Sequence, residues 1–351
     1  MPDITTVLEE KGFKLQEEQP HLGGERYLMQ AVTTTSGRKL ILLGEEVKTK
    51  KKVVIKATTD SAGKKEIEHE RKCRELLHKV NFAYDAFHSP REILHFESSN
   101  ILVNVQEYVH QESAFIDRPI EEQFAYALKA FKAQESVRAT TYSHFQVIKK
   151  VFEHRNASDY LHAFNDFVEG VRNTYGEVSV SDTMHKAQEV LTDNKVRIEQ
   201  YGDFLTHTDF VPHNFRINEG NIYLLDYSSL RFGNKHEGWA RFLNFMTLYN
   251  PRLEQALVKY VADNRAPEEN ESLWLMRLYR LGEIIFYYSG TLSNCDDKLC
   301  ELNKARIHFW HQVLVHTLEK KTLPEELRQD YIAKRDSLRS EEEKARQINL
   351  H

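Results

Sequence analysis

Short apolar runs separated by turn-prone or charged segments fill the first third of the chain. Between residues 26 and 59 these runs are RYLMQAVTT, KLILLGEE and VVIKATT. Their β-branched residues and alternation predict three strands joined by two hairpins. A helical spacing follows in AGKKEIEHERKCRELLHKV, and then two more strand-like runs, REILHFES and NILVNVQEYV. This order predicts a small antiparallel sheet that carries a single helix.

After about residue 110 the apolar spacing becomes helical. Helices are predicted over residues 119–136, 157–175, 181–196, 236–249, 252–264, 271–289 and 300–319. One small hairpin, INEG followed by NIYLLDY, interrupts them. The charged tail from Pro324 predicts a solvated helix with frayed ends. Because 351 residues exceed the usual size of one domain, we expect an α+β protein with two lobes, 1–109 and 110–323, and a tail, 324–351.

Composition narrows the classes of function. A net charge of −5 argues against a dedicated nucleic-acid binder, because such proteins concentrate positive charge to neutralise phosphates. The start lacks the features of a signal peptide, and no apolar run is long enough to cross a membrane. The cysteines suit neither a disulfide framework nor a zinc site, so Cys295 and Cys300 are expected to be free or buried thiols. These features predict a soluble, cytoplasmic protein.

Candidate chemistry gathers in LTHTDFVPHNFRINEGNIYLLDYSS, residues 205 to 229. Asp209 follows an apolar approach and enters a turn constrained by a proline. Asn214 comes five residues later, and Asp226 ends the apolar run IYLLD. Two carboxylates and a carboxamide that converge on one point suit Mg²⁺, which prefers oxygen ligands. The stretch therefore predicts a metal site beside a reacting hydroxyl.

A second candidate feature is Lys56, a lone basic residue inside the apolar run VVIKATT. Burying an unpaired ammonium group is costly, so Lys56 requires an acidic partner. The helix that follows offers Glu66, Glu68 and Glu70. Helical spacing places Glu70 on the side of Cys73 that packs against the sheet, so we expect Glu70 to be the partner.

These motifs resemble those of the aminoglycoside phosphotransferase and choline kinase-like superfamily, relatives of the protein kinases. HTDFVPHN is similar to the HxDxxxxN catalytic loop, and LLDY to the metal-binding segment. VVIK and HERKCRELL are similar to the strand lysine and the helix glutamate. The resemblance implies a bilobal protein kinase-like fold. Its N-lobe is a small antiparallel sheet with one helix, its larger C-lobe is mostly helical, and ATP binds in the cleft.

The resemblance also implies roles for residues. Asp209 accepts or orients the proton of the substrate hydroxyl, and Asn214 and Asp226 hold Mg²⁺ on the phosphates. Lys56, positioned by Glu70, grips the α- and β-phosphates.

Around these residues, His207 braces the loop through hydrogen bonds rather than taking part in the chemistry. The run VQEYVH falls where the lobes are connected, so the backbone from Glu107 to Val109 is expected to contact the adenine edge.

Two departures from the family pattern are visible. The chain has no GxGxxG motif for the loop that would cover the phosphates. The candidates for this loop are residues 22–24 or 33–37. After the metal aspartate, the family's GDPxxDLA-like segment carries an aspartate that braces the catalytic loop. This chain has RFGNKHEGWARFLNFM there, with Glu237 or nothing in that place.

The expected function is transfer of the γ-phosphate of ATP, or of GTP, to a hydroxyl of an aminoglycoside-, choline- or sugar-like small molecule. The expected enzyme is a monomer or homodimer that uses Mg²⁺ and has no nucleic-acid or membrane partner. The alternative is a catalytically silent, kinase-like nucleotide-binding or scaffold protein. The acceptor stays open, because the aromatic residues on the late helix 271–289 suit both a quaternary-ammonium cage and a packed core.

Overall fold

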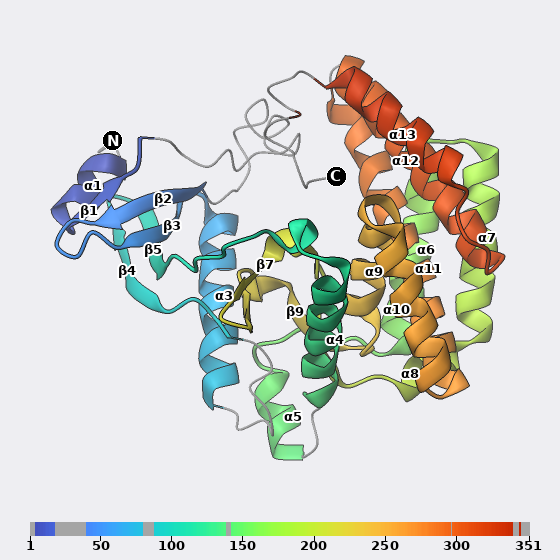
Figure 1. Cartoon of the computed structure of the whole chain (residues 1–351), viewed down its shortest axis with the longest axis horizontal. Helices are drawn as coiled ribbons and strands as arrows, with labels where there is room; N and C mark the ends of the chain where they lie inside the picture. Colours follow the sequence, from blue (N-terminus) through green and yellow to red (C-terminus); the bar gives the residue numbers. More distant parts are fainter. Residues whose placement is uncertain are drawn as a thin grey trace. The chain divides into compact units, whose positions relative to one another are not determined.

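The computed structural model of the chain describes residues 4–17, 40–79, 88–137, 142–295, 297–339 and 344. It divides into two compact units (Figure 1). Among the described residues, the first unit comprises those up to residue 115 and the segment 212–228, and the second comprises those in 116–211 and from 229 onward. The first unit is therefore discontinuous in sequence, because the segment 212–228 returns to it.

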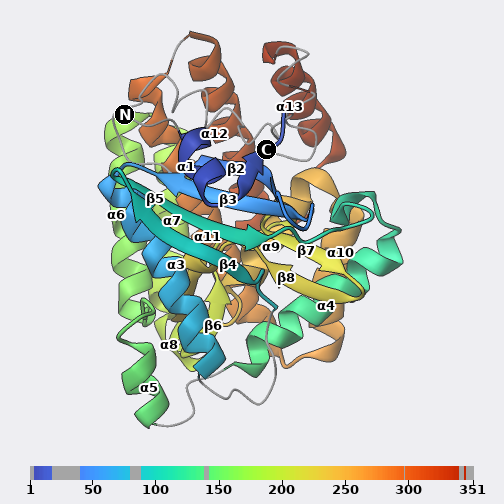
Figure 2. The same cartoon turned by 90° about the vertical axis from the view of Figure 1, so that its left-hand side faces the viewer.

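An antiparallel sheet forms most of the first unit. Its strands are β1 (Phe13–Leu15), β2 (Leu40–Glu46), β3 (Lys52–Thr58), β4 (Glu92–Ser98) and β5 (Ile101–Glu107), in the order β1-β2-β3-β5-β4. Figure 2 shows this sheet with helix α3 (Ser61–Lys79) beside it. Helix α1 (Ile4–Glu10) packs its Val7 and Leu8 into a core with Val53 and Ile55 of β3. Because side chains alternate along a strand, Lys56 points to the opposite face.

A small hairpin completes the first unit. It consists of β7 (Phe215–Asn218) and β8 (Asn221–Leu224), which pair in antiparallel register. Glu219 and Gly220 connect them with positive φ angles of 48° and 76°, as a tight two-residue turn requires. His88 exchanges backbone hydrogen bonds with β8, donating to Ile222 and accepting from Leu224 at 3.1 and 2.9 Å. These bonds attach the hairpin to the first unit.

The second unit is mostly helical. Its helices are α4 (Ile120–Ser136), α5 (Tyr142–Ile148), α6 (Ala157–Thr174), α7 (Val178–Asp193), α8 (Lys195–Gln200), α9 (Glu237–Tyr249), α10 (Pro251–Asn264), α11 (Pro267–Thr291), α12 (Asp297–Leu318) and α13 (Glu325–Leu338). Two short antiparallel strands, β6 (Phe204–His207) and β9 (Leu230–Gly233), lie among them. Every residue of α9 from Glu237 to Leu248 is buried, so α9 is the central helix of this unit.

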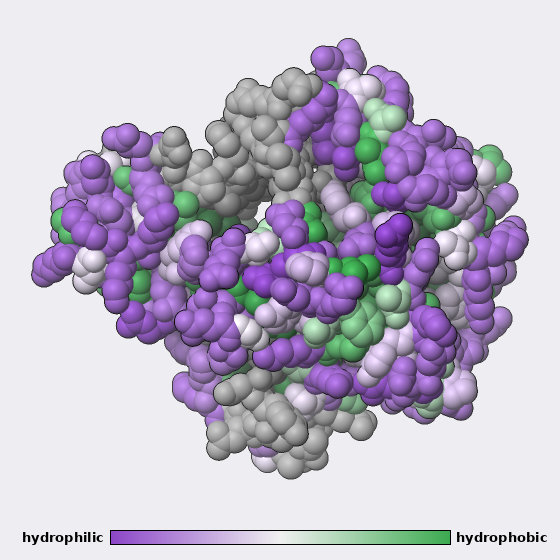
Figure 3. Space-filling model, in the orientation of Figure 1, coloured by the Kyte–Doolittle hydropathy of each residue, from purple (hydrophilic) through white to green (hydrophobic). Residues whose placement is uncertain are grey.

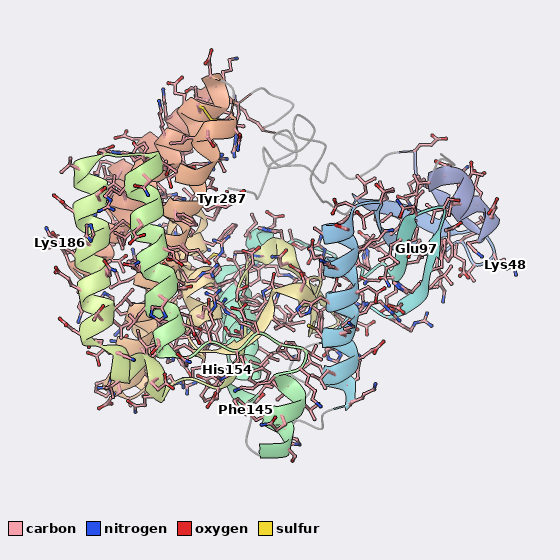
Figure 4. All side chains as sticks on the ribbon, turned by 180° about the vertical axis from the view of Figure 1, so that it is seen from behind. Lys48, Glu97, Phe145, His154, Lys186 and Tyr287 are labelled. Carbon is pink, nitrogen blue, oxygen red and sulfur yellow. A yellow bond between two sulfur atoms is a disulfide. The ribbon has the colours of Figure 1, made fainter. Side chains whose placement is uncertain are left out.

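Most predicted elements are present near their predicted positions, and helix α11 shows how a boundary shifts. It begins at Pro267 rather than at residue 271, because proline is well suited to the first turn of a helix. Helix α5 was not predicted, and its Phe145 packs edge-on against His154 with ring centroids 5.2 Å apart (Figure 4). The first predicted strand, RYLMQAVTT, and both candidate phosphate loops lie outside the described residues.

The charged tail forms helix α13, and this helix is packed rather than only solvated. The rings of Tyr331 on α13 and Phe309 on α12 stack with centroids 4.4 Å apart. Arg328 donates a hydrogen bond to the carbonyl of Leu248 at the end of α9. The tail helix is therefore part of the second unit.

One prediction about the cysteines is wrong. Cys295 and Cys300 form a disulfide, whereas the sequence favoured free or buried thiols. The turn between α11 and α12 brings their Cα atoms to 5.3 Å, within the range that a disulfide spans. Cys73 is a buried free thiol.

The outer surface of the described residues is largely polar. Figure 3 shows hydrophilic residues over most of the visible face, with apolar residues in scattered patches. Within the described ranges, no helix combines the length and apolar character needed to cross a membrane.

Candidate active site

The predicted lysine and glutamate meet in the first unit. Nζ of Lys56 lies 2.6 and 2.7 Å from the two carboxylate oxygens of Glu70, and both side chains are buried. Of the two other candidate glutamates, Glu68 pairs instead with His95 and Arg71. The strand period directs Lys56 toward α3, and the helical period directs Glu70 toward the sheet.

Lys56 also reaches the segment that carries Asp226. Its Nζ donates to the carbonyl oxygen of Leu225 at 3.1 Å, one residue before Asp226. Burial raises the pKa of the nearby Cys73 thiol to about 12, and the negative charges of Glu70 and Asp226 raise it further. The Lys56–Glu70 pair and Asp226 are therefore neighbours.

Asn214 immediately precedes β7, at the open end of the hairpin where Leu225 and Asp226 follow β8. It closes the short 3₁₀ turn Pro212–Asn214 just before β7, and its carbonyl accepts the N–H of Leu225 at 2.9 Å. The carboxylate of Asp226 accepts hydrogen bonds from the backbone N–H and hydroxyl of Ser228 at 3.1 and 2.5 Å. The hairpin thus brings the backbones of the two predicted metal ligands together.

This donor set fits Mg²⁺. One carboxylate and one carboxamide supply hard oxygen atoms, and Mg²⁺ ordinarily completes its octahedron with water and phosphate oxygens. Across the ranges that the structure describes, no three His, Cys, Asp or Glu side chains gather into a metal site.

Asp209 lies in the second unit, in the turn after β6. Oδ1 of its carboxylate accepts a hydrogen bond from Nε of Arg241 at 2.9 Å. The Arg241 side chain is almost buried, whereas that of Asp209 is 35% exposed. The ion pair fixes the direction of a carboxylate that solvent and small molecules can still reach.

The turn that carries Asp209 is held from several sides. The N–H and hydroxyl of Thr208 both donate to the carbonyl of Ser229, at 2.8 and 3.1 Å. His207 ends β6, is fully buried, and packs edge-on against Phe210 with centroids 6.1 Å apart. His207 is therefore packed into the core under this turn, and the predicted brace through its hydrogen bonds stays a prediction.

Glu237 supports the turn that carries Asp209 only indirectly. Its carboxylate is fully buried and bonded to Arg231 of β9, Arg280 of α11 and the hydroxyl of Tyr160. Because β9 pairs with β6, this cluster supports the strand that leads to Asp209. The next residue, Gly238, supports β6 directly, because its backbone N–H donates to the hydroxyl of Thr206 at 2.9 Å.

The residues predicted to contact a base lie at the end of β5. The N–H of Glu107 donates to the carbonyl of Arg91, and its carboxylate accepts the N–H of Arg91, both at 2.9 Å. Val109 is buried, and Tyr108 between them is 37% exposed. Contact of this backbone with a base stays a prediction.

Sequence reasoning missed Arg241 and the carbonyl of Leu225. Arg241 had a usable signal, because it is a charged residue within the otherwise apolar helix GWARFLNFM. A buried cation requires a partner, and that requirement pointed to an acid from another segment. The Leu225 carbonyl had no such signal, since any backbone group can accept a hydrogen bond.

The chain has the fold of solved aminoglycoside phosphotransferases, as the sequence resemblance predicted. The fold class expected from the sequence is confirmed. No model of a protein family matches the chain, and no curated protein matches its sequence. The likeness to known proteins is one of fold, seen in solved structures.

Three solved structures illustrate the likeness. A thermostable mutant of aminoglycoside phosphotransferase APH(4)-Ia, in a ternary complex with ADP and hygromycin B, has a TM-score of 0.59 and 14% identity. The alignment covers 91% of this chain and 98% of that one. The GDP complex of aminoglycoside 2'-phosphotransferase-IIIa has a TM-score of 0.62 and 12% identity, with 88% and 96% covered. Amicoumacin kinase hAmiN, with AMP-PNP, Ca²⁺ and Ami, has a TM-score of 0.59 and 10% identity, with 92% and 96% covered.

Proposed function

We propose that this chain is a phosphotransferase that transfers the γ-phosphate of ATP or GTP to a hydroxyl of a small molecule. One observation carries the proposal. The buried ammonium of Lys56 bonds both to Glu70 and to the carbonyl that precedes Asp226. A cation able to grip phosphate thus lies beside a carboxylate able to hold a metal, in a fold shared with phosphotransferases solved with ADP and GDP.

In the proposed mechanism, Lys56 grips the α- and β-phosphates, and Glu70 keeps its ammonium in position. Asn214 and Asp226 hold Mg²⁺, which when bound neutralises negative charge on the phosphates. Asp209 orients the acceptor hydroxyl and takes its proton. Such catalysis depends mainly on positioning and on charge neutralisation.

The alternative of a catalytically silent scaffold is weaker. It depended on the altered segment around Glu237, and this segment supplies a buried carboxylate and a backbone brace to the strand before Asp209. None of the side chains that the proposed chemistry requires is replaced by an inert residue. A cytoplasmic location and a monomeric or homodimeric state complete the proposal.

Calorimetric titration of the protein with ATP and with GTP, each with and without Mg²⁺, tests the nucleotide site. We expect the affinity for one nucleotide to rise when Mg²⁺ is present. Asp226→Ala should remove most of this gain, about tenfold or more in Kd, and leave metal-free binding nearly unchanged. Equal losses with and without Mg²⁺ would refute the assignment of Asp226 as a metal ligand.

Glu70→Gln is expected to weaken binding of the Mg²⁺–nucleotide complex by about tenfold, because the amide no longer holds the ammonium of Lys56 in position. The same titration measures this effect. Glu97→Gln is the matched control, since Glu97 forms an exposed ion pair with Lys64 in the same unit. An unchanged affinity in Glu70→Gln, with the fold intact by circular dichroism, would contradict the role of the pair.

A further inference from the structure

A network of polar side chains joins helix α3 to the sheet of the first unit, and the carboxylate of Glu92 on β4 is its centre. One oxygen of this carboxylate, Oε2, accepts hydrogen bonds from Nε of Arg71 at 2.8 Å and from Nη2 of Arg74 at 3.2 Å. The same oxygen accepts a third bond, from Nδ2 of Asn104 at 2.7 Å. Two donors belong to α3 and the third to β5, so Glu92 ties the helix to two strands.

The three donors are close neighbours of the Lys56–Glu70 pair. Arg71 follows Glu70 in the chain, and Arg74 lies one helical turn after Glu70, on the same buried side of α3. Asn104 lies directly opposite Lys56 in the register of β3 and β5. Residues that face each other on paired strands point to the same side of the sheet. The carboxylate that the donors share is therefore bonded to the neighbours of both members of the pair.

The amide of Asn104 is held in one orientation. Nε2 of Gln106 donates to Oδ1 of Asn104 at 2.7 Å, and both side chains are buried. An amide oxygen accepts and an amide nitrogen donates, so this bond directs Nδ2 of Asn104 toward Glu92. The same Nδ2 lies 3.4 Å from Nδ1 of His95, whose Nε2 lies 2.8 Å from a carboxylate oxygen of Glu68 on α3. The network thus runs from β5 through β4 to the helix.

The contacts of Glu92 are more protected from water than the ion pair at the other end of α3. Lys64 of α3 pairs with Glu97 of β4 at 2.7 Å, but the side chain of Glu97, labelled in Figure 4, is 53% exposed. The side chains of Arg74 and Glu92 are 7% and 30% exposed, so water and salt screen their attraction less. Burial alone would raise the pKa of Glu92, but its arginine and asparagine partners hold it below the ordinary value of 4.5.

These contacts close a ring around the pair. From Lys56 the ring passes to Glu70 and along one turn of α3 to the two arginines. It then passes through Glu92 to Asn104, and it returns to Lys56 across the backbone pairing of β5 with β3. Apolar contacts are non-directional, so they alone do not fix the rotation of α3 against the sheet. The hydrogen bonds of Glu92 are directional and supply that constraint.

We propose that Glu92 is a positioning residue for the phosphate grip of Lys56. Its carboxylate fixes α3 against the sheet, the helix fixes Glu70, and Glu70 fixes the ammonium at the end of a long, flexible side chain. This role requires no contact between Glu92 and the nucleotide. The inference rests on the proposed function and adds a residue to its nucleotide site. A purely structural Glu92 would affect stability alone, whereas a positioning residue also affects nucleotide affinity, and does so through Glu70.

Calorimetric titration with Mg²⁺–ATP or Mg²⁺–GTP, whichever the wild-type protein binds more tightly, measures the effect. Glu92→Gln keeps the shape of the side chain and removes the charge that two arginines share. We expect it to weaken binding by about fivefold, less than Glu70→Gln, because it acts at one remove from the ammonium. Glu97→Gln is the matched control, since it removes an ion pair between the same helix and the same strand. Its affinity should be unchanged.

A double-mutant cycle shows whether the effect passes through Glu70. Once Glu70→Gln has released the ammonium, the position of α3 no longer determines the grip. Adding Glu92→Gln to that variant should therefore change Kd by less than about twofold. Urea denaturation of the same variants measures stability separately, and it should show a loss from Glu92→Gln in both backgrounds.

The outcomes separate this inference from the proposed function. Absence of nucleotide binding in the wild-type protein, or an unchanged affinity in Glu70→Gln, would count against the proposed function. A loss in Glu70→Gln without a loss in Glu92→Gln would overturn the inference alone. An equal loss from Glu92→Gln in both backgrounds would also overturn it, because the residue would then act independently of Glu70.

A second variant covers the case in which Glu92→Gln does not fold. Arg71→Gln removes one of the bonds to Glu92, and the side chain of Arg71 is less buried than that of Arg74. We expect a loss of affinity of about threefold in Arg71→Gln, again absent when Glu70→Gln is present. A folded Arg71→Gln variant with the affinity of the wild-type protein would overturn the inference.

Discussion

Asp209→Asn is expected to lower the rate of phosphoryl transfer by roughly 10²- to 10⁴-fold, the usual contribution of a positioned general base. Asparagine has the shape of aspartate, and its carbonyl oxygen can still accept the hydrogen bond from Arg241. It cannot take up the proton of the acceptor hydroxyl. The proposed nucleotide ligands lie in the other unit, so the affinity for ATP should be nearly unchanged.

The rate is measured as release of ADP with the acceptor that gives the highest rate in the wild-type protein, and affinity is measured by calorimetry. Asp203→Asn is a matched control. Asp203 lies six residues earlier in the chain, pairs with His154 at 2.7 Å, and has a positive φ of 63°, which asparagine tolerates well. Full activity in Asp209→Asn would exclude Asp209 as the base. A loss of activity that matches a loss of ATP affinity would indicate a structural effect instead.

The pairing of Lys56 with Glu70 could be predicted because two local periodicities determine it. Alternation along β3 separates Lys56 from the apolar face formed by Val53 and Ile55. Spacing along α3 places Glu70 on the side of Cys73. Once the strand packs against the helix, both rules point the two side chains toward each other.

The partner of Asp209 could not be predicted in the same way. Arg241 lies 32 residues further along the chain, and its contact with Asp209 depends on how α9 packs beside β6. No local rule gives that arrangement. The strands β6 and β9 were also missed as a pair, because four residues are too few to show a reliable alternation.

The departure at Glu237 shows a further limit of the sequence. The motifs left open whether Glu237 replaces a bracing aspartate, whereas its partners in the structure are Arg231, Arg280 and Tyr160. Two of these come from elements remote in sequence. Only tertiary packing shows that the glutamate is the centre of a buried ionic cluster.

Glu237→Gln is expected to lower the free energy of unfolding by about 3–5 kcal/mol, the usual cost of removing one partner from a buried ion pair. The glutamine removes the buried charge that Arg231 and Arg280 share and leaves them only the more exposed carboxylates of Glu153 and Glu283. The hydroxyl of Tyr160, which donates to this carboxylate at 2.7 Å, also loses a charged acceptor. The loss should therefore exceed that from any exposed ion pair of this chain.

Urea denaturation followed by tryptophan fluorescence measures this loss. All 3 tryptophans, Trp239, Trp274 and Trp310, lie in the second unit, so the signal reports the unit that contains Glu237. Glu271→Gln is the control, because its pair with Arg197 is partly exposed and should contribute less than about 1 kcal/mol. Equal stability of the Glu237→Gln and Glu271→Gln variants would contradict the assignment of Glu237 as the centre of the cluster.

The dependence of stability on acid pH is an independent check of the ionic cluster around Glu237. Burial alone would raise the pKa of Glu237, but Arg231 and Arg280 together hold it below its ordinary value of 4.5. A carboxylate whose pKa is lower in the folded than in the unfolded state stabilises the protein at any pH above its unfolded-state pKa. This stabilisation is lost as the pH falls through the folded-state pKa. The unfolding free energy of the wild-type protein should therefore decline below about pH 4.5, and that of Glu237→Gln should decline less. Parallel decline in both proteins would mean that other carboxylates dominate the acid sensitivity, and that the charge of Glu237 contributes little to stability.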